Sequence, residues 1–304
     1  MTTISTNGFY DRSVTSLASL RARAETLQTQ IATSNRLERA ADDPAAARQL
    51  RALADEETMA KAYTANAGLV DADLSLAGDA LTQLTNLTIR AQELATQSAN
   101  GTLNDDQRKS NGDELAQIHA SMVAILNGKS STGNPLFAGE GDGPAFTIAA
   151  DGSASYAGTG QPAEVEVGHG ISVAGSLSGA EVVNMTVDGS DTDLLTVIHN
   201  LATSLQSGGA TAADDANAAL KALGQGLTTL STGQALIAAR QGRIELANTI
   251  ENSRSDMRAS EKSRLGATDQ TKAISQLQEV MTVLEASQAS FTKLTSLSLF
   301  DFLK

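Results

Sequence analysis

Apolar and polar positions alternate with helical spacing at both ends of this chain. At the C-terminal end, Thr268 to Lys304, apolar residues recur in steps of three and four, as on one face of a helix. That stripe comprises Ile274, Leu277, Met281, Leu284, Phe291 and Leu294. The chain then becomes apolar on nearly every side, through Leu297, Leu299, Phe300, Phe302 and Leu303. The N-terminal stripe comprises Leu17, Leu20, Ala24, Leu27 and Ile31.

The two terminal stripes predict an antiparallel helix pair that joins the ends of the chain. Each helix has one apolar face and needs a partner to cover it. Chain ends are usually frayed and solvated, so an end as apolar as this one is unusual for a lone monomer. We therefore predict that the apolar residues of both stripes, together with the apolar C-terminal residues, form an assembly interface.

The region between the two ends predicts long helices that flank a β-rich insert. Asp43 and Pro44 are a good N-cap and first helical residue, so a helix of about 80 Å follows at ~1.5 Å per residue. Asn127-Gly128 ends a third helix, and Asp151-Gly152 predicts a hairpin. The expected helices are about 13–41, 44–99, 105–127, 191–207, 213–263 with interruptions at Gly224, Gly226 and Gly233, and 269–304; short strands are expected within 145–187.

The predicted fold class is mainly α. Both chain ends would form an elongated antiparallel helical rod or coiled coil, with a small β-rich domain inserted mid-chain. This layout divides the chain into a terminal coiled-coil domain, a long-helix domain and an outer β-rich domain. Their boundaries are 1–43 plus 267–304, 44–134 plus 191–266, and 135–190.

Composition narrows the range of functions. Aromatic residues make up only 3% of the 304 residues, so the core must be mostly aliphatic, which suits packed helices better than a ligand pocket. The formal net charge of −13 argues against nucleic acid and anionic membranes as partners. The absence of cysteine excludes disulfides and thiolate sites. No secretory signal is visible at Met1 to Arg12, which indicates a cytoplasmic protein or export by a route that does not read such a signal.

Candidate chemical motifs have structural explanations. His119, His169 and His199 have no second ligand at helical metal-binding spacing. The stretch from Asp188 to Asp193 is faintly similar to a calcium loop but lacks its glycine and its terminal glutamate, and a turn followed by a helix cap at Asp191 explains it more simply. Helix capping likewise accounts for Asp42 and Asp43. We therefore predict no catalytic, cofactor-binding or metal-binding residues, no cofactor and no enzymatic activity.

Several segments resemble the bacterial flagellins and their hook-associated relatives. The segments similar to the superfamily as a whole are Ile31–Leu37, Ala40–Ala46 and Asn100–Asn104. Those similar to the hook-associated protein 3 branch, which joins hook and filament, are Pro135–Gly139, Tyr156–Gly158 with Gln161, Val165–Gly170 and Leu297–Leu303. The resemblance covers nearly the whole chain.

The resemblance implies a structural role in an extracellular flagellum. The chain would be exported unfolded by the flagellar type III apparatus with an export chaperone. It would form an adaptor ring with copies of itself, between the other hook-associated junction protein and flagellin, with its terminal helices lining the channel. Two alternatives remain at this point: a minor flagellin that builds the filament itself, and a surface module that binds a glycan or receptor through the β insert.

Overall fold

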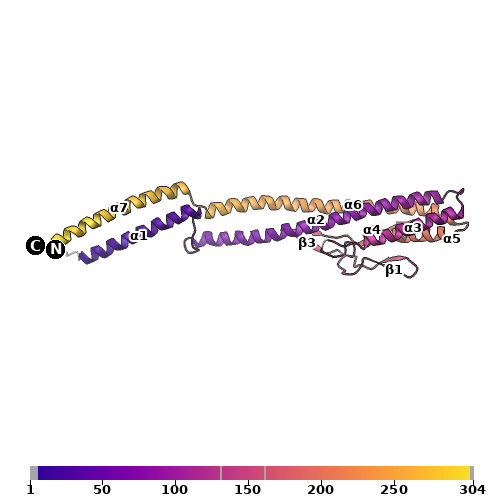
Figure 1. The fold of residues 1–304 in the computed structure, drawn as a ribbon, viewed down its shortest axis with the longest axis horizontal. Coiled ribbons are helices and arrows are strands. Elements are labelled where there is room, and N and C mark those ends of the chain that lie inside the picture. The colour runs from indigo at the N-terminus through magenta and orange to yellow at the C-terminus, as the bar shows by residue number, and fades with distance from the viewer. Residues whose placement is uncertain (1–5, 131, 161, 302–304) are drawn as a thin grey trace. The chain divides into compact units, whose positions relative to one another are not determined.

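The computed structural model describes residues 6–130, 132–160 and 162–301, apart from the side chains of residues 6, 7, 9 and 294–301. This part of the chain is mainly α-helical, with short strands between its third and fifth helices (Figure 1). The elements in chain order are α1 (Thr6–Thr33), α2 (Pro44–Ser98), α3 (Asp105–Leu126), β1 (Phe146–Ile148), β2 (Ala154–Tyr156), β3 (Glu164–Gly168), β4 (Ile171–Ala174), α4 (Gly179–Val183), β5 (Asn184–Val187), β6 (Ser190–Asp193), α5 (Leu194–Ser207), α6 (Ala212–Gly266) and α7 (Gln270–Asp301). The predicted mainly α class with a small β-rich insert is confirmed.

The chain divides into two compact units. Unit 1 comprises Met1–Thr58 and Ser253–Lys304, and unit 2 comprises Met59–Asn252. These boundaries fall inside the long helices α2 and α6, whereas the sequence analysis placed domain boundaries at helix ends. The three-domain division stays a prediction.

Unit 2 has one core, built almost entirely from aliphatic side chains and alanine. Its helices α2, α3, α5 and α6 supply most of the core, and Phe137 is a fully buried aromatic side chain within it. The largest fully buried aliphatic side chains are Leu74, Leu81, Leu84, Leu94, Leu115, Met122, Leu126, Leu177, Leu194, Leu195 and Ile198. A core of this kind accords with the low aromatic content.

In unit 2 the long helices α2 and α6 run antiparallel. Gly78 of α2 lies against Ile237 of α6, and Leu81, further along α2, lies against Gly233, earlier in α6. Gln241 of α6 adds hydrogen bonds from its Nε2 to Asp71 Oδ1 at 3.3 Å and to Ser75 Oγ at 3.2 Å. Within unit 1, Leu50 of α2 lies against Gly266 of α6, and Lys262 of α6 pairs with Glu57 of α2 at 2.7 Å. The two helices are therefore antiparallel there as well.

The expected interruptions of the returning helix at its glycines are absent, because α6 is continuous from Ala212 to Gly266. Two of these glycines instead permit close packing. A Cβ at Gly226 would lie 2.6 Å from Cδ1 of the buried Leu194, and one at Gly233 would lie 3.1 Å from Cδ1 of Leu81. Tertiary packing therefore outweighs the weak helix propensity of glycine here.

The β-rich region consists of three antiparallel hairpins. β1 pairs with β2 around the predicted Asp151-Gly152 turn, where Gly152 has φ +86°. β3 pairs with β4 across a short turn, and β5 pairs with β6. In the last hairpin Asp188 and Gly189 both have positive φ, as a two-residue turn of the primed type requires.

Two predicted helix boundaries were wrong. The helix expected to start at Asp191 starts at Leu194, because residues 190–193 form strand β6 and the N-cap is Asp193. The Asp193 carboxylate accepts hydrogen bonds from Thr196 N and Oγ1 at 2.8 and 2.6 Å. The first helix, expected over 13–41, spans Thr6–Thr33 and ends where Ser34 adopts a φ of +58°.

Helices α3 and α5 lie close together at Gly112. A Cβ there would lie 2.9 Å from the carbonyl oxygen of Ala202 and 3.0 Å from Gln206 N, and the α5 backbone cannot move aside easily. We expect Gly112→Ala to lower the free energy of unfolding by about 1–3 kcal/mol, as overpacking does in a tight core. Urea unfolding followed by circular dichroism measures the change.

Gly224→Ala is the matched control for Gly112→Ala. Gly224 is also helical, but no atom lies within 4 Å of the position its Cβ would take. The better helix propensity of alanine should stabilise this variant by about 0.5–1 kcal/mol. Equal effects of the two substitutions would contradict the close α3–α5 contact.

Candidate assembly interface

The two chain ends pair along an apolar seam between α1 and α7, which we call the terminal pair. Ala24 and Leu27 of α1 are buried against Ala273 and Val280 of α7. Leu20, Ile31 and Leu277 are partly buried and pack on the same cluster. The α7 positions 273, 277, 280 and 284 follow the alternating four-and-three spacing of a coiled coil.

Beyond this cluster the terminal pair continues with an aromatic contact. Leu284 is buried, and the rings of Tyr10 and Phe291 meet edge to face, with centroids 5.7 Å apart and planes at 88°. Residues early in α1 thus face residues late in α7, so the two helices are antiparallel.

The terminal pair also has a groove lined mostly by small residues. Its lining is Arg12, Ser13, Ser16, Leu17, Val283, Ala286, Ser287, Ser290 and Phe291.

The predicted interface residues occupy three different settings. Seven lie along the seam, buried or half-buried: Leu17, Leu20, Leu27, Ile31, Leu277, Leu284 and Phe291. Ile274 and Met281 are instead exposed, at 44% and 38% of their surface. The side chains of Leu294, Leu297, Leu299 and Phe300, and the whole of Phe302 and Leu303, lie outside the described residues.

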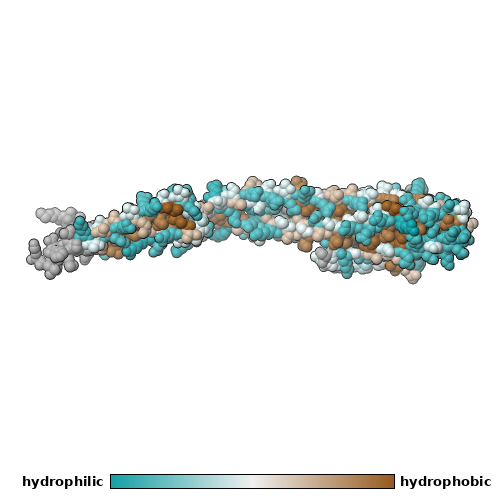
Figure 2. Space-filling view, turned by 45° about the horizontal axis from the view of Figure 1, so that its top comes forward, coloured by the Kyte–Doolittle hydropathy of each residue, from teal (hydrophilic) through white to brown (hydrophobic). Residues whose placement is uncertain are grey.

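The seam keeps Leu277 and Leu284 of the predicted stripe, and its other two α7 positions lie one residue earlier than predicted. Ala273 and Val280 are buried where the sequence analysis expected Ile274 and Met281. The four-and-three spacing through Ala273, Leu277, Val280 and Leu284 was the available signal, but the larger side chains one position later gave an equally regular pattern. Figure 2 shows the result, with hydrophobic residues exposed over the terminal pair among hydrophilic ones.

Arg36 ties the two connections that lead into the terminal pair, residues 34–43 and 267–269. Its backbone N–H donates to Gly266 O at 2.8 Å, and its guanidinium donates to Leu265 O through Nη2 at 2.9 Å and Nε at 3.2 Å. Nη2 also pairs with Asp43 Oδ2 at 3.1 Å. We call these contacts the Arg36 staple. They join the start of α2 to the end of α6 inside unit 1.

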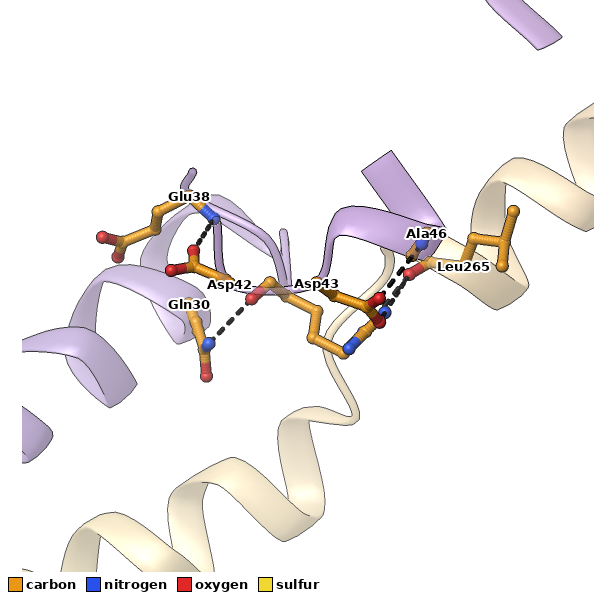
Figure 3. Close-up of polar contacts among 7 residues, drawn as sticks. Gln30, Glu38, Asp42, Asp43, Ala46 and Leu265 are labelled. Carbon is orange, nitrogen blue, oxygen red and sulfur yellow. Dashed lines mark hydrogen bonds and ion pairs between the residues drawn. The ribbon is translucent and has the colours of Figure 1, made fainter. Parts of the chain in front are cut away.

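Two acids and an amide hold the shape of the first connection (Figure 3). Asp42 accepts hydrogen bonds from Glu38 N at 3.2 Å and Arg39 N at 2.8 Å. Gln30 donates to the carbonyl oxygen of Arg36 at 2.8 Å. Asp43 caps α2 by accepting from Ala46 N at 3.1 Å, as the sequence predicts.

The Asp43 contacts favour its charged form. The hydrogen bond from Ala46 N, followed by that from the Arg36 guanidinium, lowers the pKa of Asp43. Its carboxylate therefore stays ionised at neutral pH, where it can both cap α2 and hold Arg36. Asp43, which lies in the superfamily-like segment Ala40–Ala46, thus stabilises the shape of the connection.

The second connection is tied directly to the first. Asn35 and Ala267 form an antiparallel bridge, and Thr268 N donates to Ser34 O at 2.9 Å. Asp269 caps α7 by accepting from Lys272 N at 3.0 Å. The two chain segments therefore enter the terminal pair side by side.

The other candidate chemical groups form no recognisable site. Among the described residues, no group of three or more His, Cys, Asp or Glu side chains could hold a metal ion. Asp188 pairs with Lys221, Asp191 accepts from Thr186 Oγ1 at 2.9 Å, and Asp193 caps α5, so the calcium-loop-like stretch is engaged in local structure. No described helix is long and apolar enough to span a bilayer.

The structure brings together two histidines that the sequence did not connect. His119 of α3 and His199 of α5 have ring centroids 5.4 Å apart. They lie 80 positions apart in the sequence, so no local spacing could have indicated the pair.

The geometry defines a helical protein whose two chain ends pair and carry exposed apolar positions beside their seam. A family model described as the bacterial flagellin N-terminal helical region matches residues 4–142. The chain is 26% identical over 316 residues to flagellar hook-associated protein 3 of Salmonella typhimurium, with 98% of each protein covered. It is 24% identical over 316 residues to the Escherichia coli protein of that name, with 99% of each covered.

Solved structures agree in fold. Flagellar hook associated protein-3 from Legionella pneumophila has a TM-score of 0.65 at 13% identity, covering 71% of this chain and 98% of that one. The flagellar junction protein FlgL from Legionella pneumophila has a TM-score of 0.59 at 14% identity, covering 72% and 100%. The N-terminal part of the chain is therefore similar to the bacterial flagellins, and nearly the whole chain is similar to two proteins named flagellar hook-associated protein 3. The resemblance found in its signature residues is thereby confirmed.

The Arg36 staple can be tested by substitution. Because the Arg36 side chain is 43% exposed, its ion pair contributes little, and the hydrogen bonds to Leu265 O matter more. We expect Arg36→Ala to lower the stability of unit 1 by about 1 kcal/mol. Hydrogen exchange should be faster at the amides of residues 34–43 and 265–270 and unchanged in α3 and α5.

Arg39→Ala is the matched control for this substitution. Arg39 lies in the same connection and is exposed, and its guanidinium makes no hydrogen bond within the described part of the chain. Its exchange pattern should equal that of the unsubstituted protein. A similar loss of protection in both variants would rule out a specific role for Arg36.

Proposed function

We propose that this chain is a structural protein of the bacterial flagellum that joins the hook to the filament as an adaptor ring. Two full-length relatives named flagellar hook-associated protein 3 support this role, as does a protein of similar fold described as a flagellar junction protein. In the chain itself, the terminal pair is the feature that supports this role most directly. It buries one seam and leaves Ile274 and Met281 exposed beside it.

The exposed positions beside the seam are suited to subunit contacts. Ile274 and Met281 are seven residues apart, so they lie on one flank of α7. Val14 of α1 and Val283 of α7 are also exposed, at 55% and 45%. Each Å² of apolar surface that a neighbouring subunit covers contributes about 25 cal/mol. Contact with neighbouring copies therefore gives these side chains a stabilising role that they lack in the monomer.

The partners of this protein are other flagellar components. They are copies of itself in a ring, the other hook-associated junction protein on the hook side, and flagellin on the filament side. The assembly interface comprises the terminal residues predicted from sequence, with Ile274 and Met281 on its intersubunit side. The β-rich region faces outward, away from the channel.

The protein acts outside the cell after export in an unfolded state. A flagellar type III apparatus and an export chaperone handle the chain, so no cleaved signal is needed. The absence of cysteine suits such a route, because no disulfide has to form during refolding outside the cell. The role is mechanical, and no step of it requires catalysis or a cofactor.

Deleting the gene tests the junction role. Cells without the protein should keep hooks but lose filaments, and flagellin should appear in the medium, because nothing joins filament to hook. Electron microscopy and immunoblots of the culture supernatant measure both outcomes. Filaments that remain attached, whether short or of normal length, would favour the minor-flagellin alternative.

The exposed flank can be tested separately from the fold. Ile274→Asp with Met281→Asp should leave secretion and helix content unchanged, because both side chains are exposed in the monomer. Incorporation into hook–filament preparations should fall at least tenfold, since a buried unpaired carboxylate costs several kcal/mol. Immunogold labelling and immunoblots of isolated flagella provide the measurement.

Ile148→Asp is the control for the double variant. Ile148 lies in β1 of unit 2 and is 61% exposed, so it matches the apolar-to-acid change outside the terminal pair. This variant should be incorporated normally. Normal incorporation of the double variant as well would show that the α7 flank is no subunit contact.

A further inference from the structure

A pair of histidine rings lies at the junction of three elements in unit 2. His119 belongs to α3 and His199 to α5, and their ring planes are tilted by 53°. The β1–β2 turn reaches the same place, since a Cβ on Gly152 would lie 3.5 Å from Cε1 of His199. The pair therefore connects two helices and a hairpin.

His119 occupies an unusual environment for a titratable ring. Only 6% of its surface is exposed, and its Nε2 is shielded from solvent and makes no hydrogen bond within the described part of the chain. Its side of α3 packs the apolar residues Leu115, Ile118 and Met122 into the core. A buried polar group without a partner is tolerated far better neutral than charged.

A second proton acceptor next to this ring increases the cost of charging it. Positive charge on His199 opposes positive charge on His119 at this separation. Two acids face the pair: Asp193, at the start of α5, favours a charged His119, and Asp151, in the β1–β2 turn, interacts with His199. Asp193 reduces the lowering of the His119 pKa but does not reverse it.

We propose that the His119–His199 pair is a pH-sensitive latch, in which proton uptake loosens α3 from α5 and from the β1–β2 turn. At neutral pH the buried His119 ring is uncharged and packs as an apolar group. In acid, the protonated Nε2 of His119 has no hydrogen-bond partner in its buried position, so the ring gains by reaching water. The contact that must open for this is the one between α3 and α5.

The direction of the pH effect follows from burial. Burial, then the charge of His199, lowers the pKa of His119 below its ordinary value of 6.5, and Asp193 opposes this. The unfolded chain then binds a proton more readily than the folded chain. The contribution of neutral His119 to stability is thus complete above about pH 6.5 and is lost as the pH falls below that value.

The latch is tested on the full-length protein at pH 7.5 and 5.5. The unfolding midpoint of unit 2 should fall by about 3 °C or more on acidification. His119→Leu removes the titrating ring and keeps the buried position apolar. The unfolding midpoint of this variant should therefore change much less between pH 7.5 and 5.5. Hydrogen exchange at pH 5.5, corrected for the intrinsic rate, should show lost protection in α3 and α5 of the unsubstituted protein.

Exposed His169, in the β3–β4 turn, provides the control. His169→Gln should keep the full pH dependence. An NMR titration of the histidine Cε1–H signals gives an answer even if His119→Leu does not fold, with His199→Gln used to assign the pair. Equal pH dependence in the unsubstituted protein and His119→Leu, or titration of His119 at or above pH 6.5, would overturn the proposal.

Discussion

An apolar stripe at the end of a chain stays helical in water only when another surface covers it, and here each chain end covers the other. The seam joins Leu27 to residues about 250 positions away, such as Val280. Closing so long a loop is entropically unfavourable, and the burial of the seam must offset it. Because the seam includes alanines 24 and 273, the helices can approach closely, and the larger neighbours Ile274 and Met281 stay outside. The same packing thus stabilises the terminal pair and leaves Ile274 and Met281 exposed beside its seam.

The connections into the terminal pair are held by hydrogen bonds rather than by apolar packing. Arg36 reaches the carbonyl oxygens that end α6, while Asp42 and Asp43 satisfy backbone N–H groups in the loop and at the start of α2. A loop with so many satisfied backbone groups can direct two helices without a core of its own.

Several helix contacts of unit 2 are close at glycine positions. Gly112, Gly226 and Gly233 each stand where a side chain would meet a neighbouring helix or its buried leucines. Such packing leaves little room for a charged group. His119 lies in the same α3–α5 contact, which is why a single proton there has a larger effect than on the exposed His169. Dense small-residue packing and pH sensitivity therefore have one physical origin.

The sequence by itself determined the local features of this protein. Capping chemistry predicted the start of α2 at Asp43, and the Asp151-Gly152 dipeptide predicted its hairpin, because each depends on residues within one turn. The prediction of a helix start at Asp191 was wrong because aspartate is common both in hairpin turns and at helix N-caps. Only the pairing of β6 with β5 distinguishes the two structures.

Tertiary structure alone decided which face of α7 is the seam, since helical periodicity does not distinguish Ala273 and Val280 from their larger neighbours. It also decided the contact of Arg36 with Leu265, 229 positions apart, and that of His119 with His199. Contacts of this kind depend on how distant segments fit together in space, and no local spacing in the sequence records that fit.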